Sequence, residues 1–334
     1  TAYQMTSILE GLAGLIDASL LQVAITPDGE PRYRMLETVH EFAAEQLATS
    51  SDREQTHRAY ARYFLDVAER YQLADYLPDG ERVIALLRVE QANLQAALVW
   101  FDASGDAESF VRLAAALGRY WCGLALYHEG RDWLTRAISI GGDPSSQASA
   151  KALVHLGMIA LYEGVYEEAE AYLTAGLTGC RSVEERFHQS LALIGLGGLA
   201  AMQGDVDVST SRLEESIDIA RTLADGRLAG IMIGWGLNNL AVVARMQDDA
   251  ELARERLEAG LHYSPEGEYP AGVIMALGDL GDLARDRSDY PQALAYYHEA
   301  LEVIGWKNPA TRVVIEVVEA IGIVAVAVGQ ARRG

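Results

Sequence analysis

The sequence predicts an all-α protein, a right-handed α-solenoid of paired helices, with a small N-terminal part that contains a short β-hairpin. Three observations lead to this prediction. Apolar residues recur at helical spacing over most of the chain, and small residues recur at regular long intervals after residue 107. One stretch, PRYRMLETVHEFAAEQL at 31–47, begins like a strand and ends like a helix.

The N-terminal part is expected to fold as a helix, a hairpin and a second helix. Residues 8–23 are apolar at helical spacing, and Asp28-Gly29 is a turn signal. The alternation in PRYRML, residues 31–36, predicts a strand. A helix should follow from 37 or 38 to about 47, before the break at residues 50–52.

Residues 50–106 are expected to form a helical arm. An amphipathic helix should run over about 53–74, and further helices are expected at about 80–101 and 106–126. One face of the first of these helices carries Tyr60, Phe64, Val67 and Ala68. The arm would join the N-terminal part to the repeats.

Residues 107–334 repeat at an interval near 40 residues. A small residue that follows Leu or Ile, here called the mark, stands at Gly118, Gly157, Gly197, Ala241, Gly281 and Gly322. The successive intervals are 39, 40, 44, 40 and 41 residues. This register is that of the tetratricopeptide repeat, whose period is about 34 residues, so each unit should have longer helices or loops. About six units are expected, the last of them incomplete.

Each unit should consist of helix A, which carries the mark, and helix B. Small residues at the mark and at 12 and 19 positions after it would let neighbouring helices approach closely. The large residue 16 positions after the mark should fill the space between helices A and B: Leu134, Leu173, Leu213, Leu257 and Tyr297. The position seven after the mark should turn the chain out of helix A: Ala125, Gly164, Gly204, Asp248, Ser288 and Gly329.

The charge of the chain argues against several functions. It has 27 basic and 48 acidic residues, for a formal net charge of −21. Such a chain repels phosphate, so neither direct nucleic-acid binding nor binding to an anionic membrane surface is expected. Lys151 and Lys307 are its only lysines, and neither ends a glycine-rich loop, so the sequence contains no P-loop.

No cofactor, metal or catalytic site is expected. Cys122 and Cys180 form no CxxC pair, and the 7 histidines show no zinc-ligand spacing. No Ser–His or Cys–His arrangement stands out. No apolar run reaches the ~18 residues that span a bilayer, and residues 1–12 do not resemble a signal peptide. We therefore expect a cytoplasmic protein that is not an enzyme.

Five runs in the N-terminal third carry a family resemblance: GLAGLIDASLLQ (11–22), PRYRMLETVHEFAAEQL (31–47), HRAYARYFLDVAE (57–69), VEQANLQAALVWFDASGD (89–106) and LAAALGRYW (113–121). They resemble the large bacterial transcriptional regulators of the STAND type (signal-transduction ATPases with numerous domains), often coupled to LuxR-like or SARP-like DNA-binding domains. In that family an NTPase module is followed by a winged helix and then by a superhelical repeat sensor. His40 and Phe42 stand where the family usually shows Arg and Tyr.

The resemblance implies that residues 1–49 are part of a winged-helix domain and that an NTPase module lies upstream in the same polypeptide. PRYRML would be the last strand of the winged helix. Its Tyr33 and Met35 are then expected to pack against three leucines of the preceding segment, Leu12, Leu15 and Leu20.

The register also predicts which helix A residues line a concave groove that could bind a ligand or partner. The candidates are Met158, Tyr162, Met202, Trp235, Asn238, Asn239, Arg245, Met246, Asp282 and Arg285. Met and aromatic side chains suit an adaptable apolar partner, although such residues are more often ordinary core. The paired amides could bind a peptide backbone or only join two helices. The row Asp279, Asp282 and Asp286 could bind a cation or be a solvated face paired with arginines.

Two functions fit these features. In the first, the repeats form a sensor and protein-interaction region that binds an effector or partner protein in the groove and controls the upstream NTPase switch. In the second, the solenoid is a structural scaffold for homo-oligomerisation or docking and has no small-molecule effector.

Overall fold

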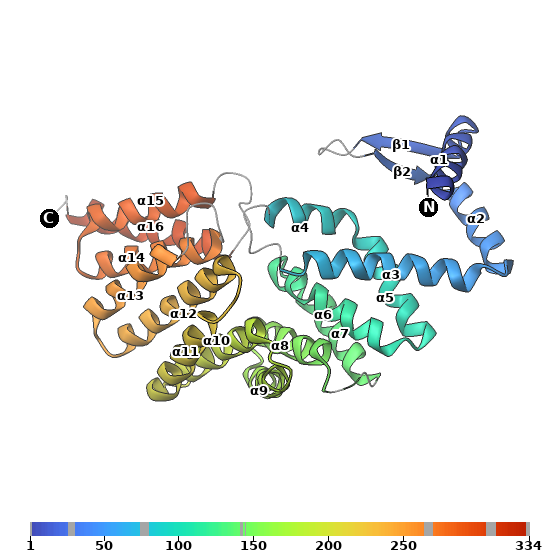
Figure 1. Ribbon diagram of the computed structural model, residues 1–334. Helices are drawn as coiled ribbons and strands as arrows, with labels where there is room; N and C mark the ends of the chain where they lie inside the picture. The colour runs from blue at the N-terminus through green and yellow to red at the C-terminus, as the bar shows by residue number, and fades with distance from the viewer. Residues whose placement is uncertain are drawn as a thin grey trace. The chain divides into compact units, whose positions relative to one another are not determined.

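The computed structural model describes residues 2–25, 31–73, 80–140, 143, 145–263, 270–304 and 312–331. The chain divides into two compact units, residues 1–60 and residues 61–334, which are described separately here. Figure 1 shows the elements in sequence order.

The first unit contains helix α1 (Ala2–Asp17), strands β1 (Leu21–Ile25) and β2 (Pro31–Met35) and helix α2 (Glu37–Thr49). The strands pair antiparallel, with Leu21 opposite Met35. The predicted strand-to-helix junction is therefore confirmed, whereas the first helix ends earlier than the apolar run because residues 21–25 are a strand. The expected turn at Asp28-Gly29 lies outside the described residues.

The predicted packing of Tyr33 and Met35 is wrong. Both side chains are exposed, by 41% and 39%, and Leu15 and Leu20 are exposed by 38% each. The physical reason is size. Helix α1 contacts β1, where Leu21 is buried, and a two-stranded sheet with so few helices cannot bury its whole apolar face.

The second unit begins within α3 (Arg53–Tyr71) and continues with α4 (Gly80–Val89) and α5 (Gln91–Ser104). Of the four residues placed on one face of this helix, Phe64, Val67 and Ala68 are buried, while Tyr60 stays 37% exposed. The single helix expected over 80–101 is two helices, separated at Glu90. Buried residues of α3, α4 and α5 share one hydrophobic core with the repeats.

The repeats are an all-α tetratricopeptide-like solenoid, as predicted, in which helices A and B alternate along the chain. The A helices are α6 (Ala107–Gly123), α8 (Gln147–Tyr162), α10 (Arg186–Met202), α12 (Gly226–Met246), α14 (Pro270–Asp286) and α16 (Arg312–Ala331). The B helices are α7 (Tyr127–Ser139), α9 (Tyr166–Ser182), α11 (Val206–Ala220), α13 (Ala250–Tyr263) and α15 (Tyr290–Ile304). Each B helix packs on the A helix before it.

The packing role of the mark is confirmed at Gly157, Gly197 and Gly281, whereas a Cβ at Gly118 would meet His155 of α8 and one at Gly322 would meet no atom within 4 Å. A Cβ added to Gly157 would lie 2.6 Å from Leu173 Cγ, and one added to Gly197 would lie 2.7 Å from Leu213 Cγ. The five large residues 16 positions after the marks are fully buried: Leu134, Leu173, Leu213, Leu257 and Tyr297. Glycine at the mark thus lets a large side chain of helix B press directly against the backbone of helix A.

The turn position is confirmed in five units. Ala125, Gly164, Gly204, Asp248 and Ser288 all have positive φ, between 54° and 81°. This left-handed conformation ends an α-helix by satisfying its last carbonyl groups. The expected turn at Gly329 is wrong, because α16 continues through it to Ala331. Glycine is tolerated inside a helix, so a small residue at this position does not by itself end one.

One described helix, α12, is long and apolar enough to cross a membrane, with a mean hydropathy of 1.2. The sequence pattern had shown no such segment. In the 18-residue stretch of α12 with this hydropathy, 72% of the residues are buried, so α12 has the environment of a core helix.

Candidate binding site on the A helices

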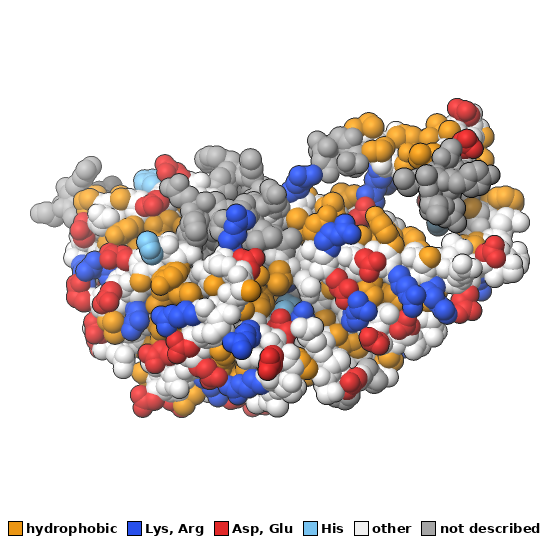
Figure 2. Space-filling view, in the orientation of Figure 1, with side chains coloured by type: hydrophobic (Ala, Val, Ile, Leu, Met, Phe, Trp, Pro, Cys, Tyr) orange, Lys and Arg blue, Asp and Glu red, His pale blue; other side chains and the backbone are white. Residues whose placement is uncertain are grey.

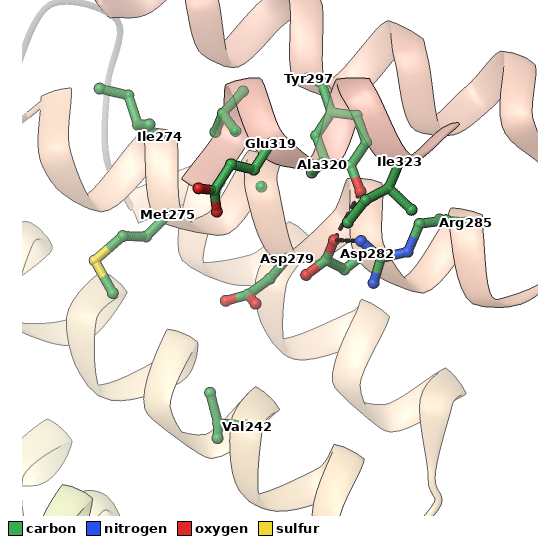
Figure 3. Close-up of a pocket in the computed structure, with 12 residues that line it drawn as sticks. Val242, Ile274, Met275, Asp279, Asp282, Arg285, Tyr297, Glu319, Ala320 and Ile323 are labelled. Atoms are coloured by element: carbon green, nitrogen blue, oxygen red, sulfur yellow. Dashed lines mark hydrogen bonds and ion pairs between the residues drawn. The ribbon is translucent and has the colours of Figure 1, made fainter. Parts of the chain in front are cut away.

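A pocket of about 430 Å³ opens among three consecutive A helices, α12, α14 and α16, with one residue contributed by α15 (Figure 3). Its volume lies within the range of small-molecule and side-chain binding sites, roughly 300–1,000 Å³. The lining residues are Val242, Ile274, Met275, Gly278, Asp279, Asp282, Arg285, Tyr297, Val317, Glu319, Ala320 and Ile323. Apolar and charged side chains therefore meet in one cavity.

A hydrogen-bond network organises the α14 side of the pocket. Tyr297 donates its hydroxyl to Asp282 Oδ1 at 2.7 Å, and Arg285 Nη1 lies 2.6 Å from the same oxygen. Burial raises the pKa of Tyr297, and the hydrogen bond to Asp282 raises it further, so the hydroxyl remains a donor. Figure 3 shows Asp282 held between these two partners.

Two further carboxylates enter the pocket from different helices. Asp279 of α14 accepts from Arg245 of α12 at 3.1 Å, which ties the two helices together. Glu319 of α16 extends toward the same space, as Figure 3 shows. Among the described residues, Glu319 makes no ion pair. The pocket thus carries three carboxylates, two of which already have an arginine partner.

The structure brings some of the predicted residues together in this pocket. Asp282 and Arg285 line it, and Arg245 reaches its edge through Asp279. The side chains of Tyr162, Met202 and Met246 are exposed by 41%, 60% and 46%, each five positions after its mark. They form a row on α8, α10 and α12 outside the pocket.

The paired amides do not act together. Trp235 is half-buried, and Asn239 donates to its backbone carbonyl within α12 at 2.9 Å. Asn238 is only 4% exposed and donates to the carbonyl of Gly272 at 3.0 Å, joining α12 to α14. The groove prediction for Asn238 is therefore wrong, since its amide serves helix packing.

Met158 is also not a groove residue. It is 4% exposed and lies in the core, because Gly195 lets α10 come close: a Cβ at Gly195 would be 3.1 Å from Met158 Sδ. The prediction considered only the position of Met158 within its own repeat. It did not take into account Gly195 of the next repeat, whose small size lets α10 cover Met158.

The sequence pattern missed Glu319, Val242 and Ile323. A signal existed for two of them, because Val242 and Ile323 stand one position after their marks, like Asp282. Nothing comparable pointed to Glu319, whose place depends on how α16 packs beside α14.

A buried polar cluster joins α8 to α10 away from the pocket. His188 Nδ1 lies 2.8 Å from Glu185 Oε2, and its Nε2 lies 3.2 Å from His155 Nε2. Burial lowers the pKa of His155 well below its usual value, helped by His188, Arg119 and Lys151. Burial alone would raise the pKa of Glu185, but the hydrogen bond and charge of His188 lower it. The cluster therefore favours a neutral His155 and an ionised Glu185, with His188 in contact with both.

The described residues contain no group of three or more His, Cys, Asp or Glu side chains placed to hold a metal ion. The acidic row of α14 is instead paired with arginines: Arg285 contacts both Asp282 and Asp286, and Arg245 contacts Asp279. On the described part of the face in Figure 2, basic side chains are interspersed with acidic ones.

Comparison with protein families identifies two parts of the chain. Residues 2–48 match the winged helix-turn-helix domain family, and residues 148–222 match the tetratricopeptide repeat family. The chain therefore combines a winged-helix region with tetratricopeptide repeats, and the first match stands although Tyr33 and Met35 are exposed.

Curated relatives are found in mycobacteria. The "Putative HTH-type transcriptional regulator Rv0890c" of Mycobacterium tuberculosis and its counterpart Mb0914c of Mycobacterium bovis are each 35% identical to this chain over 133 residues. That stretch is 40% of this chain and 15% of each relative, so the similarity spans a small part of those proteins.

Solved structures share the fold at low sequence identity. NprR in complex with its cognate peptide NprX has a TM-score of 0.61 and 11% identity, covering 86% of this chain and 76% of that one. The apo form of the quorum sensor NprR from B. thuringiensis has a TM-score of 0.59 and 11% identity, covering 84% and 74%.

Proposed function

We propose that this chain is the sensor and protein-interaction region of a transcriptional regulator, and that its A-helix face binds a peptide or a segment of a partner protein. The observation that carries the proposal is the pocket among α12, α14 and α16, with the row Tyr162, Met202 and Met246 exposed on the preceding A helices. Exposed methionines suit a partner surface because their side chains adapt to different shapes.

The comparisons support the same proposal. A solved structure with this fold is titled as a complex with a cognate peptide, and the curated relatives are named as HTH-type transcriptional regulators. Peptide recognition by a repeat groove needs exposed apolar anchors and a few placed polar groups, and the pocket offers both.

The proposed mechanism is a population shift in a larger STAND-type protein. Peptide binding would favour one arrangement of the repeats, and an NTPase module in the same polypeptide would change its nucleotide affinity in response. The two binding events must then be coupled reciprocally, so nucleotide would change peptide affinity by the same factor. In this scheme the chain itself performs no catalysis and needs no cofactor.

Peptide selection tests the binding step. A randomised 12-residue peptide library is selected on the purified chain, and the selected peptides are titrated by calorimetry against Gly278→Leu, which places a side chain in the pocket. A Cβ at Gly278 meets only Val317 Cγ2, at 3.7 Å, so the substitution should fill space without breaking the fold. We expect affinity to fall at least tenfold, about 1.4 kcal/mol.

Gly226→Leu is the matched control, because a Cβ there meets no atom within 4 Å and Gly226 lies outside the pocket. Circular dichroism should show both variants folded. Selected peptides that bind Gly278→Leu as well as the unchanged chain would show that this pocket is not the site. A stable dimer in light scattering, with no peptide selected, would favour the scaffold function instead.

A further inference from the structure

The geometry points to a ligand class for the pocket: we infer that it binds the positively charged side chain of an arginine or lysine in the bound peptide, with Glu319 as the counter-charge. This inference deepens the proposed function and rests on it. It arises from the coexistence of an apolar wall and a carboxylate without an ion pair in one cavity of about 430 Å³.

The charges of the pocket favour a cation over an anion. The arginine that lines it and the one at its edge are already engaged: Arg285 contacts Asp282 and Asp286, and Arg245 contacts Asp279. An anionic ligand would have to compete with these carboxylates for the arginines and would meet the negative charge of Glu319, which is costly in a partly buried site. A cation meets Glu319 without breaking any of them.

The charge of the chain acts in the same direction. With a formal net charge of −21, the chain attracts cationic ligands and repels anionic ones over distances of several ångströms. Long-range attraction raises the association rate, while the contact with Glu319 would provide the specificity.

The apolar wall explains why the inferred group is a side chain with a long stem. Val242, Met275 and Ile323 are exposed by 41%, 38% and 56%, and all three face the pocket. Arginine and lysine cover apolar surface with their methylene groups while the charged end stays near a carboxylate. A metal ion or another inorganic cation has no apolar part that could contact this wall.

The test uses the same peptide library. Peptides selected on the unchanged chain should be enriched in arginine or lysine at one position. The best binder is then resynthesised with citrulline in place of arginine, or norleucine in place of lysine, and titrated. We expect the neutral peptide to bind about tenfold more weakly or worse, as expected for a lost charged hydrogen bond.

Glu319→Gln should lower the affinity for the charged peptide by a similar factor and leave the affinity for the neutral peptide unchanged. Glu255→Gln is the control, because Glu255 is exposed on α13 and does not line the pocket. Peptides that depend on the pocket but show no basic residue, prefer acidic residues, or ignore Glu319→Gln would overturn this inference and leave the proposed function standing. If the library yields no binder, both fall together.

Discussion

The A-helix face is closed between α8 and α10 and open among α12, α14 and α16, although both regions follow the same repeat register. One position after the mark, Met158 is 4% exposed in the closed region. The equivalent Val242 and Ile323 are 41% and 56% exposed in the open region. The register therefore fixes which side chains point toward the neighbouring A helix, but not whether that helix closes over them.

Between Met158 and Val242, the difference follows the residue two positions before the mark of the next A helix. In α10 this residue is Gly195, and its lack of a side chain lets α10 come close to Met158 and Leu173. In α14 it is Asp279, which extends into the pocket and pairs with Arg245. At this position, a glycine in α10 accompanies a core contact, and an aspartate in α14 accompanies a cavity.

The largest expected difference between the two regions comes from removing large side chains. Leu173→Ala should lower the free energy of unfolding by about 2–5 kcal/mol, because a fully buried side chain leaves a cavity. Ile323→Ala, in the pocket wall, should cost less than about 0.5 kcal/mol. Urea denaturation followed by circular dichroism measures both. Equal losses would mean that the open region is closed in solution.

Two glycine-to-alanine substitutions should change the free energy of unfolding in opposite directions. In Gly157→Ala the new Cβ would lie 2.6 Å from Leu173 Cγ and 2.9 Å from the backbone nitrogen of Leu173, so overpacking should cost about 1–3 kcal/mol. Gly278→Ala has room and should gain up to about 1 kcal/mol, since alanine favours the helix more than glycine. Thermal unfolding compares them, and a stable Gly157→Ala would disprove the close approach of α8 and α9.

The smallest expected effect is a pH dependence that belongs to the closed region. The fold holds His155 neutral, with His188, Arg119 and Lys151 around it, so the unfolded chain binds more protons below its ordinary pKa of about 6.5. Stability should therefore fall as the pH drops from 7.5 to 5.5. His155→Gln, whose amide can still donate to His188, should flatten this slope, measured as melting temperature against pH.

The control for the pH experiment is His298→Gln, because His298 is exposed on α15. This variant should keep the slope of the unchanged protein. A slope that His155→Gln does not alter would show that the acid sensitivity arises elsewhere, for example at Glu185, whose lowered pKa stabilises the fold only above the range where it is protonated.

Features that depend on one repeat were predictable from the sequence. The fold class, the strand-to-helix junction at 31–47, the buried large residue of each helix B and the five turns all follow from local periodicity and spacing. These features need only a helix and its own partner, and the sequence order supplies both.

Features that depend on two repeats or on a missing neighbour were not predictable. The burial of Met158 required Gly195, which lies one unit away, and Asn238 became a packing residue because Gly272 of α14 faces it. The exposure of Tyr33 and Met35 depends on how few helices cover a small hairpin. For the pocket, spacing identified Asp282 and Arg285, while Glu319 needed the position of α16.

The turns between helices A and B bear on how such repeats are recognised. Five units share one backbone angle there but only partly share a residue: two use glycine, and Ala125, Asp248 and Ser288 adopt the same left-handed conformation. For a residue with a side chain, that conformation costs about 1–2 kcal/mol. The packing of the helices on either side offsets this cost. Repeat units can therefore differ in amino-acid type at this position while they keep the same backbone conformation. A comparison of sequences alone therefore finds fewer repeats than a comparison of backbone angles.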